Sequence, residues 1–125
     1  MFKDKVLMIT GGTGSFGNAV LRRFLDSDVR EIRIFSRDEL KQHDMKNDGF
    51  SSSKMRYFLG DVRDLPRLNQ AMIDVDYVVH AAAIKHVPAA EYNPMECIKT
   101  NIHGAENVIH AAFANNVDKV IALST

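Results

Sequence analysis

Three glycines stand three residues apart near the start of the chain, at Gly11, Gly14 and Gly17, directly after the apolar run 6–9. Gly11 can adopt the positive φ of a tight turn, and Gly14 has no Cβ to keep the backbone away from an anion. Gly17 lets the next helix lie close to the strand, and the N–H groups at that helix start favour negative charge. The spacing predicts a site for the diphosphate of a dinucleotide. A glycine-rich turn without a ligand is the simpler alternative.

Basic residues follow the second apolar run, in the order Ser36, Arg37 and Lys41. The planar guanidinium of Arg37 suits a ribose 2′-phosphate, whereas an acid directly at the strand end would bind a free 2′-hydroxyl. The order therefore favours NADP over NAD. Asp38 and Glu39 keep NAD open as an alternative. Another alternative is that Ser36 only caps the next helix, in a capping box with Glu39, and that Arg37 is a solvated charge.

The third apolar run ends in Gly60, Asp61 and Val62. A carboxylate at this position can accept a hydrogen bond from the amine of adenine, and an apolar side chain after it can cover the ring. We therefore expect Asp61 and Val62 to contact the adenine. Asp64 is better explained as the cap of the following helix.

The fourth apolar run ends in three alanines at 81–83, which leave the backbone open to a flat ligand such as ribose and nicotinamide. Lys85 and His86 follow in the loop, where a cation could hold a sugar or phosphate oxygen; a solvated surface pair is the alternative. His80 is expected to be a packed strand residue. Asn101 lies on an apolar helical stripe, where it needs partners if it is buried, and it could brace the loop.

The elements that must position these residues alternate along the chain. Strands are predicted at 5–10, 31–36, 55–59, 77–82 and 119–124, and helices at 16–26, 38–46, 65–73 and 94–115. The strands are nearly continuous apolar runs, as in sheets that are covered on both faces. The pattern predicts an α/β fold of the Rossmann type, a doubly wound parallel sheet with helices on both faces and strand order 3-2-1-4-5.

Composition limits the function further. The chain has 125 residues, enough for one domain with a real core, and its 16 basic residues balance its 16 acidic ones. The balance argues against nucleic acid or an anionic membrane as a partner. The first apolar run is too short for a signal peptide or a membrane span, and Cys97 is the only cysteine, so we expect a cytoplasmic protein. The histidines show no spacing typical of metal ligands.

These motifs together resemble the extended short-chain dehydrogenase/reductase superfamily. The resemblance rests on residues 10–17, 60–62, 81–83, 101 and 123–125. Residues 36–41 and 83–102 are similar to nucleotide-sugar 4,6-dehydratases, above all to the inverting, 5-epimerising members that act on UDP-N-acetylglucosamine in pseudaminic acid biosynthesis. In that family NADP transiently oxidises C4 of the sugar, water is lost across C5 and C6, and the hydride returns to C6 with inversion at C5.

The resemblance implies roles for individual residues. Substrate contacts with the UDP-sugar are implied for Lys85 and Thr125. Homo-oligomers are expected of the full-length protein. Cofactor contacts are implied for Gly11, Thr13, Gly14, Ser15, Phe16, Gly17, Ser36, Arg37, Asp38, Glu39, Leu40, Lys41, Asp61, Val62, Ala81, Ala82, Ala83 and Asn101.

The acid–base residues of the family are an Asp-Lys pair and a Tyr-x-x-x-Lys pair, which lie beyond the position of Thr125. We therefore expect residues 1–125 to be the NADP-binding N-terminal fragment of a longer enzyme, without catalytic residues and inactive by itself. A retaining 4,6-dehydratase or a nucleotide-sugar 4-epimerase built on the same cofactor module is one alternative. A non-catalytic NADP-binding regulatory module is another.

Overall fold

The computed structural model describes residues 2–11, 15–47, 52–81 and 94–122. Strands and helices alternate, and their ends lie within two residues of the predicted ones wherever both are described. In chain order the elements are β1 (Val6–Thr10), α1 (Ser15–Leu25), β2 (Glu31–Ser36), α2 (Glu39–Asn47), β3 (Met55–Leu59), α3 (Leu65–Ala71), β4 (Tyr77–His80), α5 (Pro94–Ala114) and β5 (Lys119–Ala122).

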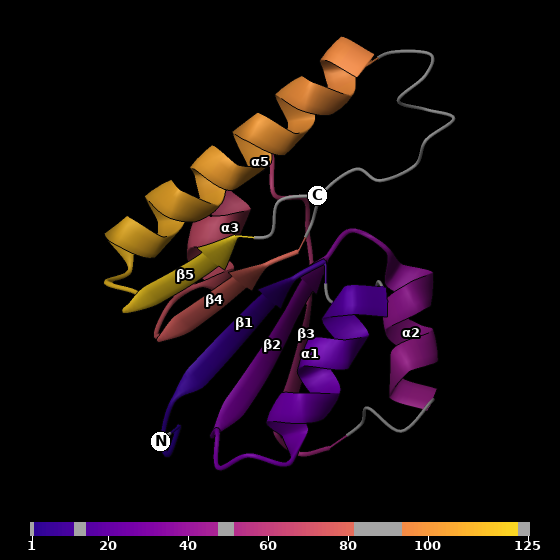
Figure 1. The fold of residues 1–125 in the computed structure, drawn as a ribbon, viewed down its shortest axis with the longest axis vertical. Helices are drawn as coiled ribbons and strands as arrows, with labels where there is room; N and C mark the ends of the chain where they lie inside the picture. Colours follow the sequence, from indigo (N-terminus) through magenta and orange to yellow (C-terminus); the bar gives the residue numbers. More distant parts are fainter. Residues whose placement is uncertain (1, 12–14, 48–51, 82–93, 123–125) are drawn as a thin grey trace.

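The strands form one parallel sheet in the order β3-β2-β1-β4-β5, which confirms the predicted topology. Helices α1 and α2 cover one face, and α3 and α5 cover the other (Figure 1). Chain reversal at β1 produces this arrangement: the chain first winds outward to β2 and β3 and then crosses to β4 and β5 on the other side. Such a reversal leaves a crevice beyond the carboxyl ends of the central strands.

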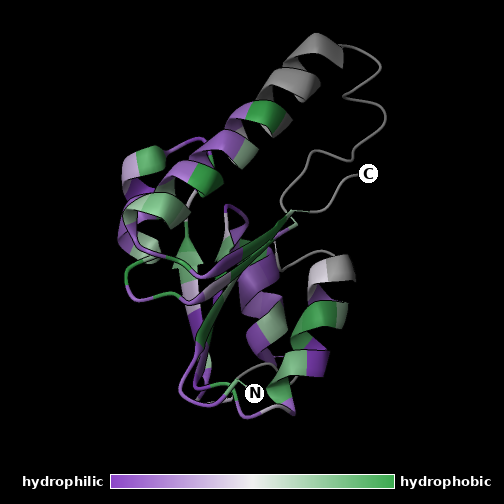
Figure 2. Cartoon of the chain, turned by 60° about the vertical axis from the view of Figure 1, so that its left-hand side comes forward, coloured by the Kyte–Doolittle hydropathy of each residue, from purple (hydrophilic) through white to green (hydrophobic). Residues whose placement is uncertain are grey.

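Strand β1 lies at the centre, and all five of its residues are buried. Val6 and Met8 belong to the hydrophobic cluster under α3 and α5, whereas Leu7 and Ile9 belong to the cluster under α1 and α2. Successive side chains point to opposite faces, so a strand covered on both sides must be apolar throughout, as the hydropathy colours show (Figure 2). Each such side chain contributes about 1.5–3 kcal/mol through burial.

The helix starts agree with the predicted caps in one case and not in the other. The carboxylate of Asp64 accepts a hydrogen bond from the Arg67 N–H (3.2 Å) at the start of α3, as predicted. The predicted capping box of Ser36 with Glu39 is wrong. Ser36 is the last residue of β2, so α2 starts only at Glu39, and the cap is Asp38, whose carboxylate accepts the N–H of Lys41 (3.0 Å).

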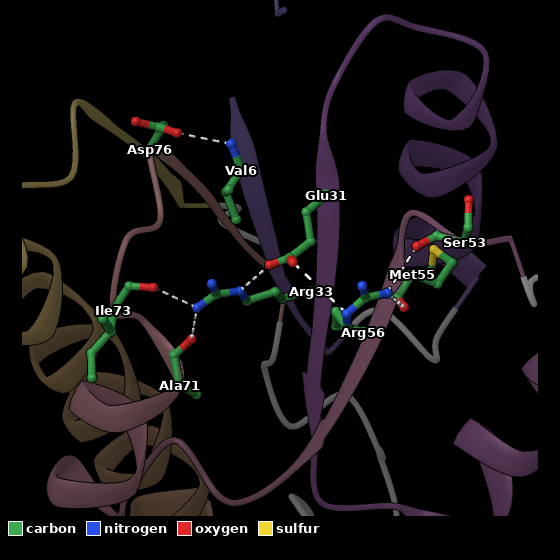
Figure 3. Close-up of polar contacts among 9 residues, drawn as sticks. All are labelled: Val6, Glu31, Arg33, Ser53, Met55, Arg56, Ala71, Ile73 and Asp76. Carbon is green, nitrogen blue, oxygen red and sulfur yellow. Dashed lines mark hydrogen bonds and ion pairs between the residues drawn. The ribbon is translucent and has the colours of Figure 1, made fainter. Parts of the chain in front are cut away.

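Charged side chains fasten the amino ends of the strands (Figure 3). The Asp76 carboxylate accepts the N–H of Val6 at 2.8 Å. Arg33 of β2 donates to two backbone carbonyl groups at the end of α3 (2.8 and 2.6 Å) and pairs with Glu31, which also lies 3.8 Å from Arg56 of β3. The strand starts and the end of α3 are thereby tied together at the edge opposite to the predicted site.

Among the described residues, no helix combines the length and hydropathy needed to cross a membrane.

Gly60, directly after β3, is held where a side chain does not fit. A Cβ at this position would lie 2.7 Å from Cζ of Phe35 and 3.0 Å from Cγ of Arg67. Phe35 is fully buried, so moving its ring aside would disturb the packed core.

We expect Gly60→Ala to lower the free energy of unfolding by about 1–3 kcal/mol, measured by urea denaturation. Phe35→Leu removes the obstructing ring atoms, so Gly60→Ala should cost clearly less in that background; strictly additive effects would refute the steric explanation.

Candidate cofactor site

Four of the predicted binding residues that the structure describes lie at the carboxyl edge of the sheet. Gly11 follows β1, Arg37 follows β2, Asp61 lies after β3 and Ala81 follows β4. The strands are parallel, and Thr10 is aligned with Phe35 on one side and with His80 on the other, so their ends meet at one edge (Figure 1). The structure thus brings together the residues that sequence reasoning assigned to four separate segments.

Gly11, directly after β1, has the predicted positive φ. Gly11 has φ 71°, and its N–H donates to the carbonyl of Phe35 at 2.9 Å. Helix α1 starts at Ser15, and Gly17 is buried within its first turn. Gly11 thus turns the chain at the end of the buried strand, and α1 begins four residues later. Thr13 and Gly14 lie outside the described residues, and the side chains of Ser15 and Phe16 are not described.

A buried pair joins the ends of β1 and β4. The hydroxyl of Thr10 lies 2.6 Å from Nδ1 of His80 and accepts the N–H of Ala81 at 3.2 Å. This hydrogen bond ties the end of β1 to the end of β4. Burial lowers the pKa of His80 and keeps the ring neutral. The prediction of a packed strand histidine is confirmed, but its partner was not foreseen.

Two guanidinium groups flank Asp61. Its carboxylate accepts hydrogen bonds from the Arg63 side chain (2.7 Å) and backbone (2.9 Å), and Nη1 of Arg37 lies 3.8 Å from Oδ2. The Arg63 hydrogen bonds, together with the charges of Arg63 and Arg37, hold the pKa of Asp61 below its ordinary value, so it is ionised at neutral pH. Arg37 itself is 62% exposed and makes only this long contact among those described, so its donors can still reach an anion.

The end of β2 contains a buried amide that sequence reasoning missed. Nε2 of Gln42, in α2, lies 2.8 Å from Oγ of Ser36 and 3.0 Å from the carbonyl oxygen of Phe58 in β3. Gln42 is therefore a link between the ends of two neighbouring strands. The sequence signal that could have predicted this link is the position of Gln42, one helical turn after the cap Asp38. Glu39, Leu40 and Lys41 are exposed beside it.

A second amide and a glycine hold the end of β3 from the other face. Nδ2 of Asn107 in α5 donates to the carbonyl of Val62 at 2.9 Å. A Cβ on Gly104 would lie 2.8 Å from Cγ2 of Val62, so the glycine makes room for that side chain. Neither residue was predicted. Contact of Asp61 and Val62 with adenine stays a prediction.

Other predicted site residues cannot be placed. Ala82, Ala83, Lys85, His86 and Thr125 lie outside the described residues, and for Asn101 only its position in α5 is described. Within the described part of the chain, no cluster of three or more His, Cys, Asp or Glu side chains could hold a metal ion.

The sheet order, the positive φ of Gly11 and the helix that begins four residues later define an α/β domain of the Rossmann type. A family model described as "Polysaccharide biosynthesis protein" matches residues 7–125. The chain belongs to this family.

Several relatives match the whole chain, and two of them are described here. It is 63% identical over 126 residues to the UDP-N-acetylglucosamine 4,6-dehydratase (inverting) of Campylobacter jejuni subsp. jejuni serotype O:23/36. It is 60% identical over 129 residues to a UDP-glucose 4-epimerase of Rickettsia prowazekii. The chain spans only 37% and 38% of the lengths of these relatives.

Solved structures show the same fold. Pen from Bacillus thuringiensis superimposes with a TM-score of 0.90 at 44% identity, covering 98% of this chain and 37% of that one. A double mutant of DesIV, a dTDP-glucose 4,6-dehydratase from Streptomyces venezuelae with NAD bound, superimposes with a TM-score of 0.80 at 26% identity, covering 95% of this chain and 39% of that one. The family resemblance inferred from the motifs is thereby confirmed.

The lowered pKa of His80 makes stability depend on pH. Between this pKa and the ordinary value of 6.5, the unfolded chain binds a proton that the folded chain does not. The free energy of unfolding should therefore decrease as pH falls below about 6.5, with a slope of at most about 1.4 kcal/mol per pH unit from this group. Urea denaturation at several pH values between 5 and 8 measures it.

His80→Asn is the test variant, because an amide can form a hydrogen bond with the Thr10 hydroxyl but does not titrate. It should flatten the dependence on pH. His110→Asn, on the exposed side of α5, is the matched control and should leave the dependence as it is in the wild type. An unchanged dependence in His80→Asn would show that another group causes it.

Proposed function

We propose that the chain is the cofactor-binding part, residues 1–125, of an NADP-dependent nucleotide-sugar 4,6-dehydratase that converts UDP-N-acetylglucosamine to a 4-keto-6-deoxy sugar nucleotide with inversion at C5. The observation that carries the proposal is the identity of 63% to an inverting UDP-N-acetylglucosamine 4,6-dehydratase along the whole chain. The geometry of the carboxyl edge supports it, because Gly11 and the residues that follow β2 and β3 lie at one edge of the parallel sheet, where ligands bind in folds of this type.

The residues at this edge fit a nicotinamide dinucleotide. When bound, the cofactor supplies a hydride acceptor that later returns the hydride. The start of α1 would hold the diphosphate through backbone N–H groups. Arg37, exposed and fixed only loosely by Asp61, would bind the 2′-phosphate, and Asp61 would accept the adenine amine with its remaining lone pairs.

The sugar end of the site is assigned by resemblance. Residues 81–83 would lie along the ribose and nicotinamide, with Lys85 and Thr125 on the sugar nucleotide. Proton transfer would come from the Asp-Lys and Tyr-x-x-x-Lys pairs beyond Thr125, because none of the residues assigned here removes the C5 proton or protonates the leaving hydroxyl. We expect the 125-residue chain to bind cofactor without turnover. The full-length protein would be a cytoplasmic homo-oligomer.

A second candidate function is 4-epimerisation of a UDP-sugar. The Rickettsia prowazekii relative bears that name at 60% identity along the whole chain. Both reactions would start with hydride removal from C4, so the same cofactor half would serve either one. The product separates them, since a dehydratase releases water and an epimerase does not change the mass.

Cofactor selectivity tests the role of Arg37. Arg37→Ala should weaken NADP binding by about 1.5–3 kcal/mol, the range for a hydrogen bond to a charged group, and leave NAD binding nearly unchanged. Isothermal titration with both cofactors measures this. Arg56→Ala, at the opposite edge of the sheet, is the matched control and should bind both as the wild type does. Equal losses for NADP and NAD in Arg37→Ala would contradict the assignment.

Turnover tests the proposed reaction. The 125-residue chain and the same chain extended through the Asp-Lys and Tyr-x-x-x-Lys pairs are each incubated with UDP-N-acetylglucosamine. The extended chain should release water without an added reductant, because the hydride leaves and returns within one cycle, and the shorter chain should not. Mass spectrometry follows the loss of water. Turnover by the shorter chain would refute the proposal that proton transfer depends on residues beyond Thr125. Isomerisation without a change in mass would favour the epimerase.

A further inference from the structure

Gln42 is buried to an extent unusual for its type. Only 6% of the residue is exposed, although its neighbours in α2 are polar and solvated. A buried amide without partners would cost about 1–3 kcal/mol, so its hydrogen bonds matter. Nε2 lies 2.8 Å from Oγ of Ser36, 3.0 Å from the carbonyl oxygen of Phe58 and 3.3 Å from the carbonyl oxygen of Ser36. The side chain thus joins α2 to the ends of β2 and β3.

These contacts fix the direction of the hydrogen bond to Ser36. Two of the three acceptors are backbone carbonyl groups, which can only accept, so the atom facing them must be the NH₂ group of Gln42. The Ser36 hydroxyl therefore accepts from Gln42, and its own proton remains available for donation. Among the described residues, none accepts a hydrogen bond from this hydroxyl.

We propose that Gln42 is a positioning residue that makes Ser36 an obligatory hydrogen-bond donor toward the 2′-phosphate. The inference rests on the proposed function and deepens it. A phosphate oxygen can only accept, whereas the 2′-hydroxyl of NAD can donate or accept. A fixed donor at this position therefore favours the phosphate.

The test compares affinities for NADP and NAD in Gln42→Met, which keeps the length of the side chain but cannot donate. NADP should bind about tenfold more weakly, equal to about 1.4 kcal/mol, and NAD should change less than about twofold. Gln70→Met, an exposed glutamine of α3, is the matched control and should alter neither affinity. Equal weakening of both cofactors would show a merely structural role and overturn the proposal, as would unchanged affinities.

Ser36→Ala provides a second route, because it removes the hydroxyl with little change in volume. It should reproduce the selective loss of NADP affinity even if Gln42→Met fails to fold. The double variant should lose no more NADP affinity than Ser36→Ala alone, since Gln42 acts through that hydroxyl. Additive losses would overturn the proposal. A wild-type chain that binds neither cofactor would refute the proposed function itself, whereas NADP binding with unaltered selectivity in both variants would refute only the role of Gln42.

Discussion

The complete burial of β1 is the constraint on which the rest of the structure depends. Its five residues are covered on both faces and paired with a parallel strand on both sides, so the strand itself offers no surface for binding. Only its ends are accessible. At the carboxyl end the chain must turn sharply away, and Gly11 with φ 71° makes that turn possible. The described residues Arg37, Asp61 and Ala81, which follow β2, β3 and β4, lie at the same edge of the sheet as this turn because these strands run parallel to β1.

The two edges of the sheet use arginine in different ways. At the amino edge, the side chain of Arg33 is 15% exposed and its donors are taken by Glu31 and by carbonyl groups at the end of α3. At the carboxyl edge, Arg37 is 62% exposed and lies 3.8 Å from Asp61. An arginine whose donors are satisfied by the protein stabilises the fold, whereas one with unused donors can bind a ligand. The contrast agrees with the proposal that Arg37, rather than Arg33, binds a ligand.

The sequence predicted the strands, the helices and their order well, because apolar runs and glycine spacing are local signals. The sequence-based prediction failed where a side chain bonds to a residue far away in the chain, and where two neighbouring residues could both cap the same helix. Ser36 and Asp38 are both good helix caps, and only the pairing of Ser36 within β2 decides for Asp38. Asn107 donates a hydrogen bond to Val62, 45 positions away in the chain, and the residues next to Asn107 in the sequence do not predict that contact. The same is true of the link from Gln42 to Phe58.

The position of β3 explains why these buried amides are needed. It is an edge strand, paired only with β2, so its free side cannot be fixed by a neighbouring strand. Gln42 binds the carbonyl of Phe58 from the face of α2, and Asn107 binds the carbonyl of Val62 from the face of α5. The segment that carries Asp61 is therefore held from both faces by helices rather than by a strand. Helix α5, which holds this segment through Asn107, also contains Asn101, one of the residues predicted to contact the cofactor.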